Sequence, residues 1–186
     1  MVIDMKLDQD HNLREGVQDL LTYCGQTHKG TKKTPERFVN ALRELLSGYD
    51  VDPKRILTTT FDDTNDLVCL TDIPFFSLCE HHLLPIQGVV HIAYLPHDRV
   101  VGLSKLPRLV QALSRRLIIQ ERFTSQIAEI LMKTLRPKGV YVIVEAEHMC
   151  MQMRGVRSEG KMKTSALRGI FMNEAPRMEA LKIMFH

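Results

Sequence analysis

The sequence is poor in aromatic residues and cysteines, and each shortage excludes a class of protein. None of its 186 residues is tryptophan and only 6% are aromatic, which argues against a nucleic-acid surface built on stacked rings. The net charge of +3, from 25 basic and 22 acidic residues, is also small for that role. The four cysteines show no tight spacing pattern, so no disulfide framework is expected.

Long apolar runs are missing as well. No stretch is long and apolar enough to span a bilayer, and residues 1–6 lack a secretory pattern. We therefore expect no membrane partner and a cytoplasmic protein whose cysteines stay reduced. The hydrophobic content of 44% still allows an ordinary core, and the length favours one domain with a small helical appendage.

The apolar spacing predicts a mixed chain that begins with helices. One helix should end at Gly25 with Cys24 in the core, and another should start with a capping Thr34 followed by Pro35. Strands and helices then mix without a regular βαβ rhythm, which favours an α+β fold. We place an N-terminal helical region at 1–55 and the main domain at 56–186. The expected strands are 58–61, 67–71, 88–95, 140–153 and 166–171, and later helices carry Leu109 to Leu117, Phe123 to Leu135 and Met178 to Phe185.

The run from Cys79 to His82 is the first candidate site. Cys79 and His82 are three residues apart, so both side chains can reach one ion from a single turn, and Cys150 would add a ligand from a distant segment. Two thiolates and one imidazole suit Zn²⁺, and three protein ligands leave a fourth position for water. A closed structural site with Cys69 as the fourth ligand is the alternative, although its spacing matches no usual zinc motif.

Two further histidines accompany these ligands. His81 and His148 would stand as free imidazoles beside the metal-bound water, where they could move protons near neutral pH. The alternative for His81 is a surface or supporting histidine. The strand predicted from Val140 to Met153 would carry His148 and Cys150 on one face, because side chains alternate along a strand.

Other polar residues suggest an anionic ligand. Basic side chains cluster at 29–37 and at 154–168, which indicates either solvated faces or a site for an anion. Gln120 and Glu121 lie at the junction of two predicted helices. Glu121 is either an exposed residue favourable to the helix dipole or a carboxylate that binds a donor-rich base edge such as that of guanine.

Several separate motifs together resemble the zinc-dependent GTP cyclohydrolase I family. They occur in order between about Thr34 and Phe171. The motifs are Cys79-Glu80-His81-His82, Gly102-Leu103-Ser104-Lys105, Gln120-Glu121-Arg122-Phe123-Thr124, Glu145-Ala146-Glu147-His148-Met149-Cys150 and Arg154-Gly155.

The resemblance implies a complete set of site residues. Cys79, His82 and Cys150 would hold Zn²⁺, which would activate water to attack C8 of GTP. The implied catalytic residues are His81, His148 and Ser104, and the implied substrate-binding residues are Gln120, Glu121, Lys105, Arg108, Arg154 and Arg37. The products would be 7,8-dihydroneopterin triphosphate and formate, in the first step of tetrahydrofolate and pterin biosynthesis.

The resemblance also implies a fold and an assembly. The family's tunnelling fold is an antiparallel sheet with helices packed on one side, closed into barrels by neighbouring subunits, and it suggests a homodecamer with sites between subunits. One departure is visible at residues 159–163, which interrupt a run of serine and threonine typical of the family.

Two other functions remain open from the sequence. The first is a paralogue with the same fold that acts on another purine nucleotide or on a pterin. The second is a zinc-stabilised interaction module whose basic face binds a partner or a nucleic acid.

Overall fold

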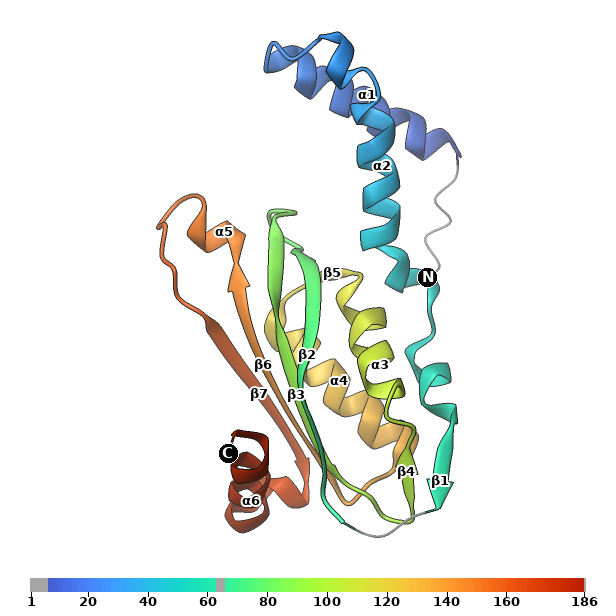
Figure 1. The fold of residues 1–186 in the computed structure, drawn as a ribbon, viewed down its shortest axis with the longest axis vertical. Helices are drawn as coiled ribbons and strands as arrows, with labels where there is room; N and C mark the ends of the chain where they lie inside the picture. The colour runs from blue at the N-terminus through green and yellow to red at the C-terminus, as the bar shows by residue number, and fades with distance from the viewer. Residues whose placement is uncertain (1–6, 63–65, 186) are drawn as a thin grey trace.

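A five-stranded sheet organises the protein (Figure 1). The computed structural model describes residues 7–62 and 66–185. The strands are β1 (Thr60–Asp62), β2 (Val68–Cys79), β3 (Pro85–Leu95), β4 (Arg99–Val101), β5 (Leu117–Ile118), β6 (Gly139–His148) and β7 (Met162–Gly169). The sheet order is β5-β2-β3-β6-β7, in which only β5 runs parallel to its neighbour, and β1 pairs with β4 separately.

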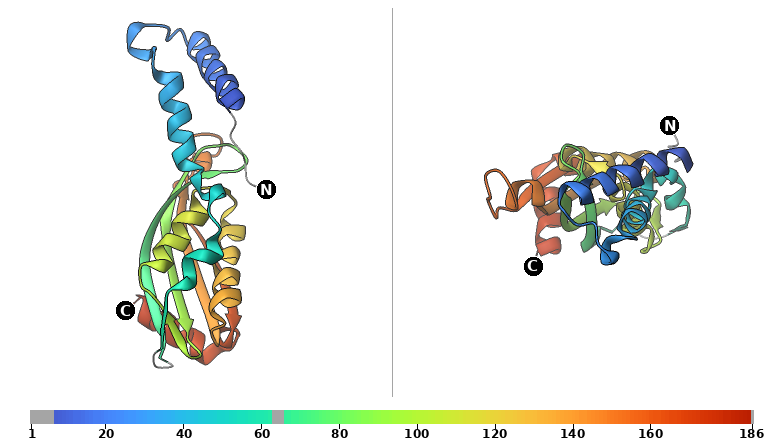
Figure 2. Two further views of the ribbon diagram at one scale, coloured as in Figure 1. Left: turned by 90° about the vertical axis from the view of Figure 1, so that its right-hand side faces the viewer. Right: turned by 90° about the horizontal axis from the view of Figure 1, so that it is seen from above.

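Helices cover the sheet and extend beyond one of its ends. They are α1 (Leu7–Tyr23), α2 (Thr34–Leu45), α3 (Lys105–Ser114), α4 (Gln120–Leu135), α5 (Met149–Gln152) and α6 (Glu174–Phe185), with 3₁₀ turns at Lys29–Thr31, Ser47–Asp50, Pro53–Thr58 and Ile170–Met172. α3 and α4 pack on one face, whereas α6 covers part of the other (Figures 1 and 2). The predicted α+β tunnelling architecture, with its antiparallel sheet and N-terminal helices, is confirmed.

Alternation along β6 divides the core between the two faces of the sheet. Val140, Val142 and Val144 are fully buried in the cluster that includes α3 and α4. Tyr141 and Ile143 point the other way and pack in the cluster that includes α6. Because both faces are covered, this strand reads as a continuous apolar run.

The α1–α2 hairpin rises past the end of the sheet (Figure 2). Inside it, the buried carboxylate of Asp10 pairs with Arg43. The apolar stripe of these helices is nevertheless exposed, with Leu20 and Phe38 at 58% and 46% of full exposure. Cys24, predicted to pack in the core, is exposed too. This correction follows from the geometry, because the helices turn these side chains away from the rest of the chain.

Several element boundaries differ from the prediction. Thr34 is already helical and Lys33 precedes the helix without a side-chain capping bond. Leu117 lies in β5, paired with Leu78, and not in a helix. The strand predicted at 67–71 continues to Cys79 through an irregularity at Asp72, whose φ is 55°. The boundary predicted between residues 55 and 56 stays a prediction.

Among the described residues, no helix combines the length and the apolar character needed to cross a membrane.

Candidate active site

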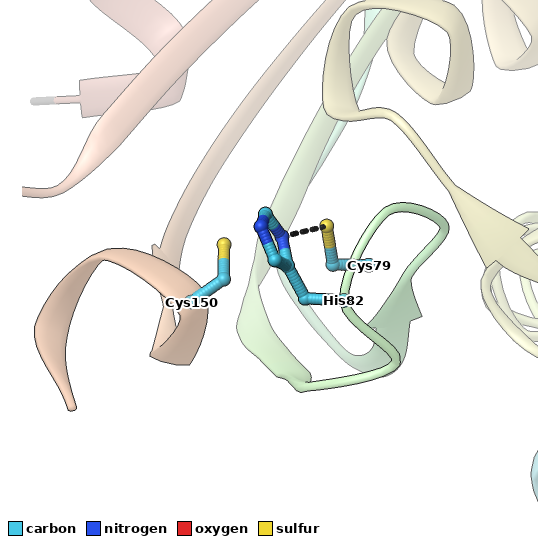
Figure 3. A group of neighbouring side chains, drawn as sticks. All are labelled: Cys79, His82 and Cys150. Atoms are coloured by element: carbon cyan, nitrogen blue, oxygen red, sulfur yellow. Dashed lines mark hydrogen bonds between the residues drawn. The ribbon is translucent and has the colours of Figure 1, made fainter. Parts of the chain in front are cut away.

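Three potential metal ligands converge at one end of the sheet (Figure 3). The sulfurs of Cys79 and Cys150 and a ring nitrogen of His82 all lie within 4.8 Å of one another. The distance from Cys79 Sγ to His82 Nδ1 is 3.7 Å. In the described part of the chain, this is the one group of three such donors.

The connection between β2 and β3 explains how Cys79 and His82 meet. The Leu83 amide donates to the Cys79 carbonyl at 2.9 Å, and the Cys79 amide donates to the Leu84 carbonyl at 2.9 Å. Leu83 has a φ of 54°, which lets the chain reverse within these few residues. The closed turn holds both side chains at the same end of the sheet.

Cys150 reaches the site in a different way from the one predicted. β6 ends at His148 and α5 begins at Met149, so the prediction of a strand continuing to Met153 is wrong. The pairing partner of β6 also stops there, because Ile86 pairs with His148 and β3 begins at Pro85, which has no amide hydrogen. Cys150 therefore approaches the other ligands from a single helical turn.

The donor set fits a soft divalent cation. Burial raises the pKa of the Cys150 thiol, and the neighbouring Cys79 raises it further. A cation between the two sulfurs would reverse that trend by stabilising the thiolates, and thiolate with imidazole is the ligand chemistry of Zn²⁺. Cys69 lies outside the group, and burial together with Glu179 raises its pKa to about 11. The alternative that Cys69 closes a structural zinc site gains no support from this arrangement.

His148 lies at the end of β6 beside the ligands. Its Nε2 is 2.7 Å from Oε1 of Gln120, the first residue of α4. Burial lowers the pKa of His148, and the negative charge of Glu121 acts against that shift. A half-buried imidazole with a lowered pKa is neutral near pH 7, which suits it to accept a proton.

Gln120 belongs to a buried network that joins α4 to β6 and β7. Its Nε2 donates to the carbonyls of Val144 and Met162, at 3.1 and 3.0 Å, and lies 3.2 Å from Oγ1 of Thr164. Oγ1 of Thr164 is 2.6 Å from that of Thr124, which donates in turn to the Gln120 carbonyl at 2.7 Å. Gln120 itself is only 1% exposed.

His81 lies on the open side of the site. Its side chain is 61% exposed, and its Nδ1 is 3.9 Å from Cys79 Sγ. The adjacent Glu80 forms an ion pair with Arg122 at 2.9 Å, which ties the turn to α4. His81 is thus placed between the metal ligands and solvent.

The loop that departs from the family pattern is anchored by charge. Lys163 pairs with Glu145 at 2.9 Å, directly across the β6–β7 ladder, and Lys161 pairs with Glu147 at 3.5 Å. Lys163 makes its ion pair within the ladder, and Lys161 makes a second one directly before β7 begins, at the point where the family pattern differs.

The remaining predicted residues are divided between two regions. Glu121, exposed in the first turn of α4, and Arg154, exposed after α5, lie on the segments that carry the metal ligands and His148. Ser104, Lys105 and Arg108 lie at the start of α3, beside β4, whereas the end of α3 leads to β5 and Cys79 (Figure 1). The ten residues of α3 span about 15 Å, so these groups lie apart from the metal ligands in one chain.

Arg37 is also remote, on the projecting α2. Sequence reasoning missed the supporting role of Thr124 and Thr164, which are 40 residues apart. No local pattern marks them, because their contact depends on how α4 packs against β7.

A family model described as GTP cyclohydrolase I matches residues 13–184. The chain is 48% identical over 169 residues to the GTP cyclohydrolase 1 of Campylobacter concisus, covering 88% of this chain and 89% of that one. It is 50% identical over 163 residues to that of Campylobacter lari, covering 85% and 86%, and 48% identical over 175 residues to that of Mycobacterium bovis, covering 90% and 87%.

A solved structure, the archaeosine synthase QueF-Like in the apo form, covers 57% of this chain and 97% of that chain at 19% identity. Its TM-score of 0.48 is too low to support an argument. The family model and the three relatives, which each cover most of the chain, are sufficient: the chain belongs to the GTP cyclohydrolase I family.

Proposed function

We propose that this protein is an enzyme that converts GTP and water to 7,8-dihydroneopterin triphosphate and formate, the first step of tetrahydrofolate and pterin biosynthesis. One observation carries the proposal. In a chain of this family, Cys79, His82 and Cys150 converge from distant segments and His148 lies two residues from the third ligand. Three ligands leave room for water, which is the composition of a hydrolytic site.

The site residues divide the chemistry among them. Cys79, His82 and Cys150 would hold Zn²⁺, which would supply a Lewis acid able to lower the pKa of a water molecule. His148 accepts and returns protons while the imidazole ring of guanine opens and C8 leaves as formate, and the exposed His81 exchanges protons with solvent. Glu121 accepts hydrogen bonds from N1–H and N2–H₂ of guanine, with Gln120 beside it.

The residues at the start of α3 complete the site from another subunit. Ser104 assists opening of the ribose, and Lys105 and Arg108, with Arg154 and Arg37, bind the triphosphate through charge-assisted hydrogen bonds. The separation of α3's start from the metal ligands in one chain supports an assembly in which a neighbouring copy supplies these groups. We propose a homodecamer, as the family resemblance implies, that works in the cytoplasm, where its ligand thiols stay reduced.

A GTP turnover assay on the zinc-loaded protein tests the proposal. It follows formate release together with the fluorescence of the oxidised pterin product. We expect both signals, and we expect both to disappear after chelation and to return when Zn²⁺ is restored. Formate without pterin would limit the activity to ring opening, and absence of both signals with zinc bound would refute the proposed reaction.

The substrate has its own test in Glu121. Replacing it with glutamine removes the negative charge and turns one of the two carboxylate acceptors into an N–H₂ donor that would face a guanine donor, but it leaves the zinc ligands intact. We expect Glu121→Gln to raise KM for GTP at least tenfold with unchanged zinc content, the cost of about 1.4 kcal/mol or more for one lost charged hydrogen bond. Equal GTP affinity in both proteins would favour another nucleotide or a pterin.

A further inference from the structure

The side chain of Gln120 has every polar atom committed to protein groups. Its nitrogen faces the carbonyls of Val144 and Met162, and its oxygen faces Nε2 of His148 at 2.7 Å. The residue is 1% exposed, so neither atom is free to contact a ligand in solvent. A side chain placed this way can influence a substrate only through the residue that it contacts, which here is His148.

The surrounding groups determine which way the amide points. The Val144 and Met162 carbonyls can only accept hydrogen bonds, so the atom that faces both must be the amide nitrogen. The carbonyl oxygen is then left to face His148. That oxygen can only accept, so Nε2 of His148 must carry the hydrogen in this contact.

The two threonines behind Gln120 agree with this orientation. Thr124 donates its hydroxyl hydrogen to the Gln120 main-chain carbonyl at 2.7 Å, so Thr164 must be the donor in the 2.6 Å contact between them. The Thr164 oxygen lies 3.2 Å from the Gln120 nitrogen, whose two hydrogens are shared among this oxygen and the two carbonyls. The main-chain carbonyls therefore fix which side-chain groups donate in this network.

We propose that Gln120 is a positioning residue that holds His148 as the tautomer protonated on Nε2, which leaves Nδ1 as the ring nitrogen with the free lone pair. The inference deepens the proposed function, since it rests on His148 acting as the proton carrier. It gives Gln120 a role distinct from contact with the guanine base. A neutral imidazole can serve as a base only through its unprotonated nitrogen, so the tautomer decides which ring atom must face the reacting group.

Kinetics separate this role from direct binding. Gln120→Met keeps the length of the side chain and removes the acceptor that orients His148. We expect kcat per zinc-loaded site to fall about 10- to 100-fold, with KM for GTP within about twofold of wild type, because orientation of the acid–base group is lost and substrate contacts are not. A rise in KM with unchanged kcat would overturn the inference.

Ser125→Ala provides the matched control. Ser125 lies on the same helix and also receives a hydrogen bond from β7, from Arg168 at 2.8 Å, but it has no contact with Gln120 or His148. We expect this variant to keep the kcat and KM of wild type. An equal loss of kcat in both variants would mean that any weakening of the α4–β7 contact impairs the enzyme, and the positioning role would fall.

Neutron diffraction from crystals of the zinc-loaded wild-type protein tests the tautomer without any turnover. We expect deuterium on Nε2 of His148, directed at Oε1 of Gln120. Deuterium on Nδ1 with a bare Nε2 overturns the inference, whatever the variants show. If the wild-type protein does not turn GTP over, the proposed reaction fails, and the neutron map still decides the tautomer.

Discussion

At the scale of single residues, the candidate metal site consists of three side chains that have unequal surroundings. Cys79 is buried, Cys150 is half-buried and His82 is exposed. Each provides one ligand atom, and among the described residues no fourth donor lies within 4.8 Å of all three. The loss of any one ligand therefore leaves two protein donors in the group.

Replacing Cys150 tests whether zinc binding depends on all three. Cys150→Ser puts a hydroxyl, which is a poor zinc ligand at neutral pH, where a thiolate is needed. We expect zinc content and GTP turnover to fall together by more than tenfold, measured by elemental analysis and by formate release. Cys24→Ser, at an exposed cysteine on α1, should change neither. Full turnover in metal-free Cys150→Ser would contradict the zinc mechanism.

Some of the contacts in the candidate site could be predicted from the sequence, and others could not. The spacing of Cys79 and His82 predicted that their side chains converge, and the structure brings them together, because a three-residue separation needs only a tight turn. The partnership of Gln120 with His148 could not be predicted. The two residues are 28 positions apart, and they meet only because α4 starts where β5 has brought the chain beside β2.

At the scale of elements, β3 has no room for a side chain beside β6 at Gly88. A Cβ atom at this position would lie 2.1 Å from the Glu145 carbonyl oxygen and 2.7 Å from the Ala146 Cβ. Both atoms belong to β6, so β3 and β6 would have to move apart to admit a side chain at Gly88. Gly88 therefore controls the packing of the central ladder that ends at His148.

Gly88→Ala should be strongly destabilising. We expect a loss of about 1–3 kcal/mol in the free energy of unfolding, from overpacking against main-chain atoms, and a fall of several degrees in the melting temperature. Gly16→Ala is the matched control, since Gly16 lies within α1 with no atom within 4 Å of its added methyl group. That variant should be neutral or stabilising by up to about 1 kcal/mol. Equal melting curves for the two variants would contradict the packing argument.

The α1–α2 hairpin depends on one buried charge. The Asp10 side chain is 3% exposed and pairs with Arg43, which is 41% exposed. Arg43→Met should leave the carboxylate buried without its cation and destabilise the hairpin by on the order of 2 kcal/mol. Hydrogen exchange across α1 should then accelerate more than tenfold, whereas the double variant Asp10→Asn with Arg43→Met should recover part of the protection. Unchanged hydrogen exchange in Arg43→Met would show that the ion pair does not stabilise the hairpin.

Element positions were predicted well where periodicity was long, and badly where an irregularity intervened. The repeated apolar spacing of α4 and the apolar run of β6 both gave the correct element type. Pro74 and Asp72 look like strand breakers, yet β2 passes through both as the bulged continuation of one strand. The end of β6 depends on where its partner β3 begins. The sequence of β6 alone carries no information about that position.

At the scale of the whole molecule, one chain carries two groups of predicted site residues that lie at opposite ends of α3. The metal ligands and His148 lie at one end of α3, and Lys105 and Arg108 lie at the other. If neighbouring copies combine these parts, as we propose, then two inactive variants damaged in different parts should restore each other. Subunits dissociated and mixed before assembly provide the means to observe this.

Mixing His148→Ala with Lys105→Ala should therefore recover activity, because some sites receive an intact His148 from one subunit and an intact Lys105 from another. We expect recovery of up to about a quarter of wild-type turnover for random mixing in equal amounts, with sites formed independently. Mixing His148→Ala with Cys150→Ser should recover none, since these residues share one part of the site. Recovery in neither mixture would contradict a shared site.

The overall assembly could not be predicted from residue patterns, and only the family resemblance suggested it. The exposed stripe of α1 and α2 illustrates the reason. Apolar residues at helical spacing indicate a face that is covered, but the spacing does not specify whether the covering surface belongs to the same chain or to another copy. In this chain Leu20 and Phe38 remain exposed.

The fixed directions of the hydrogen bonds around Gln120 have one more consequence, for the route that protons take. A relay through a chain of groups requires every member to exchange its donor and acceptor roles, as water molecules do. An amide nitrogen held by the Val144 and Met162 carbonyls cannot do so, because it would have to give up a hydrogen that it does not release in water. The interior behind His148 is therefore closed to proton conduction, and every proton that the imidazole gains or loses passes through the solvent side of the site.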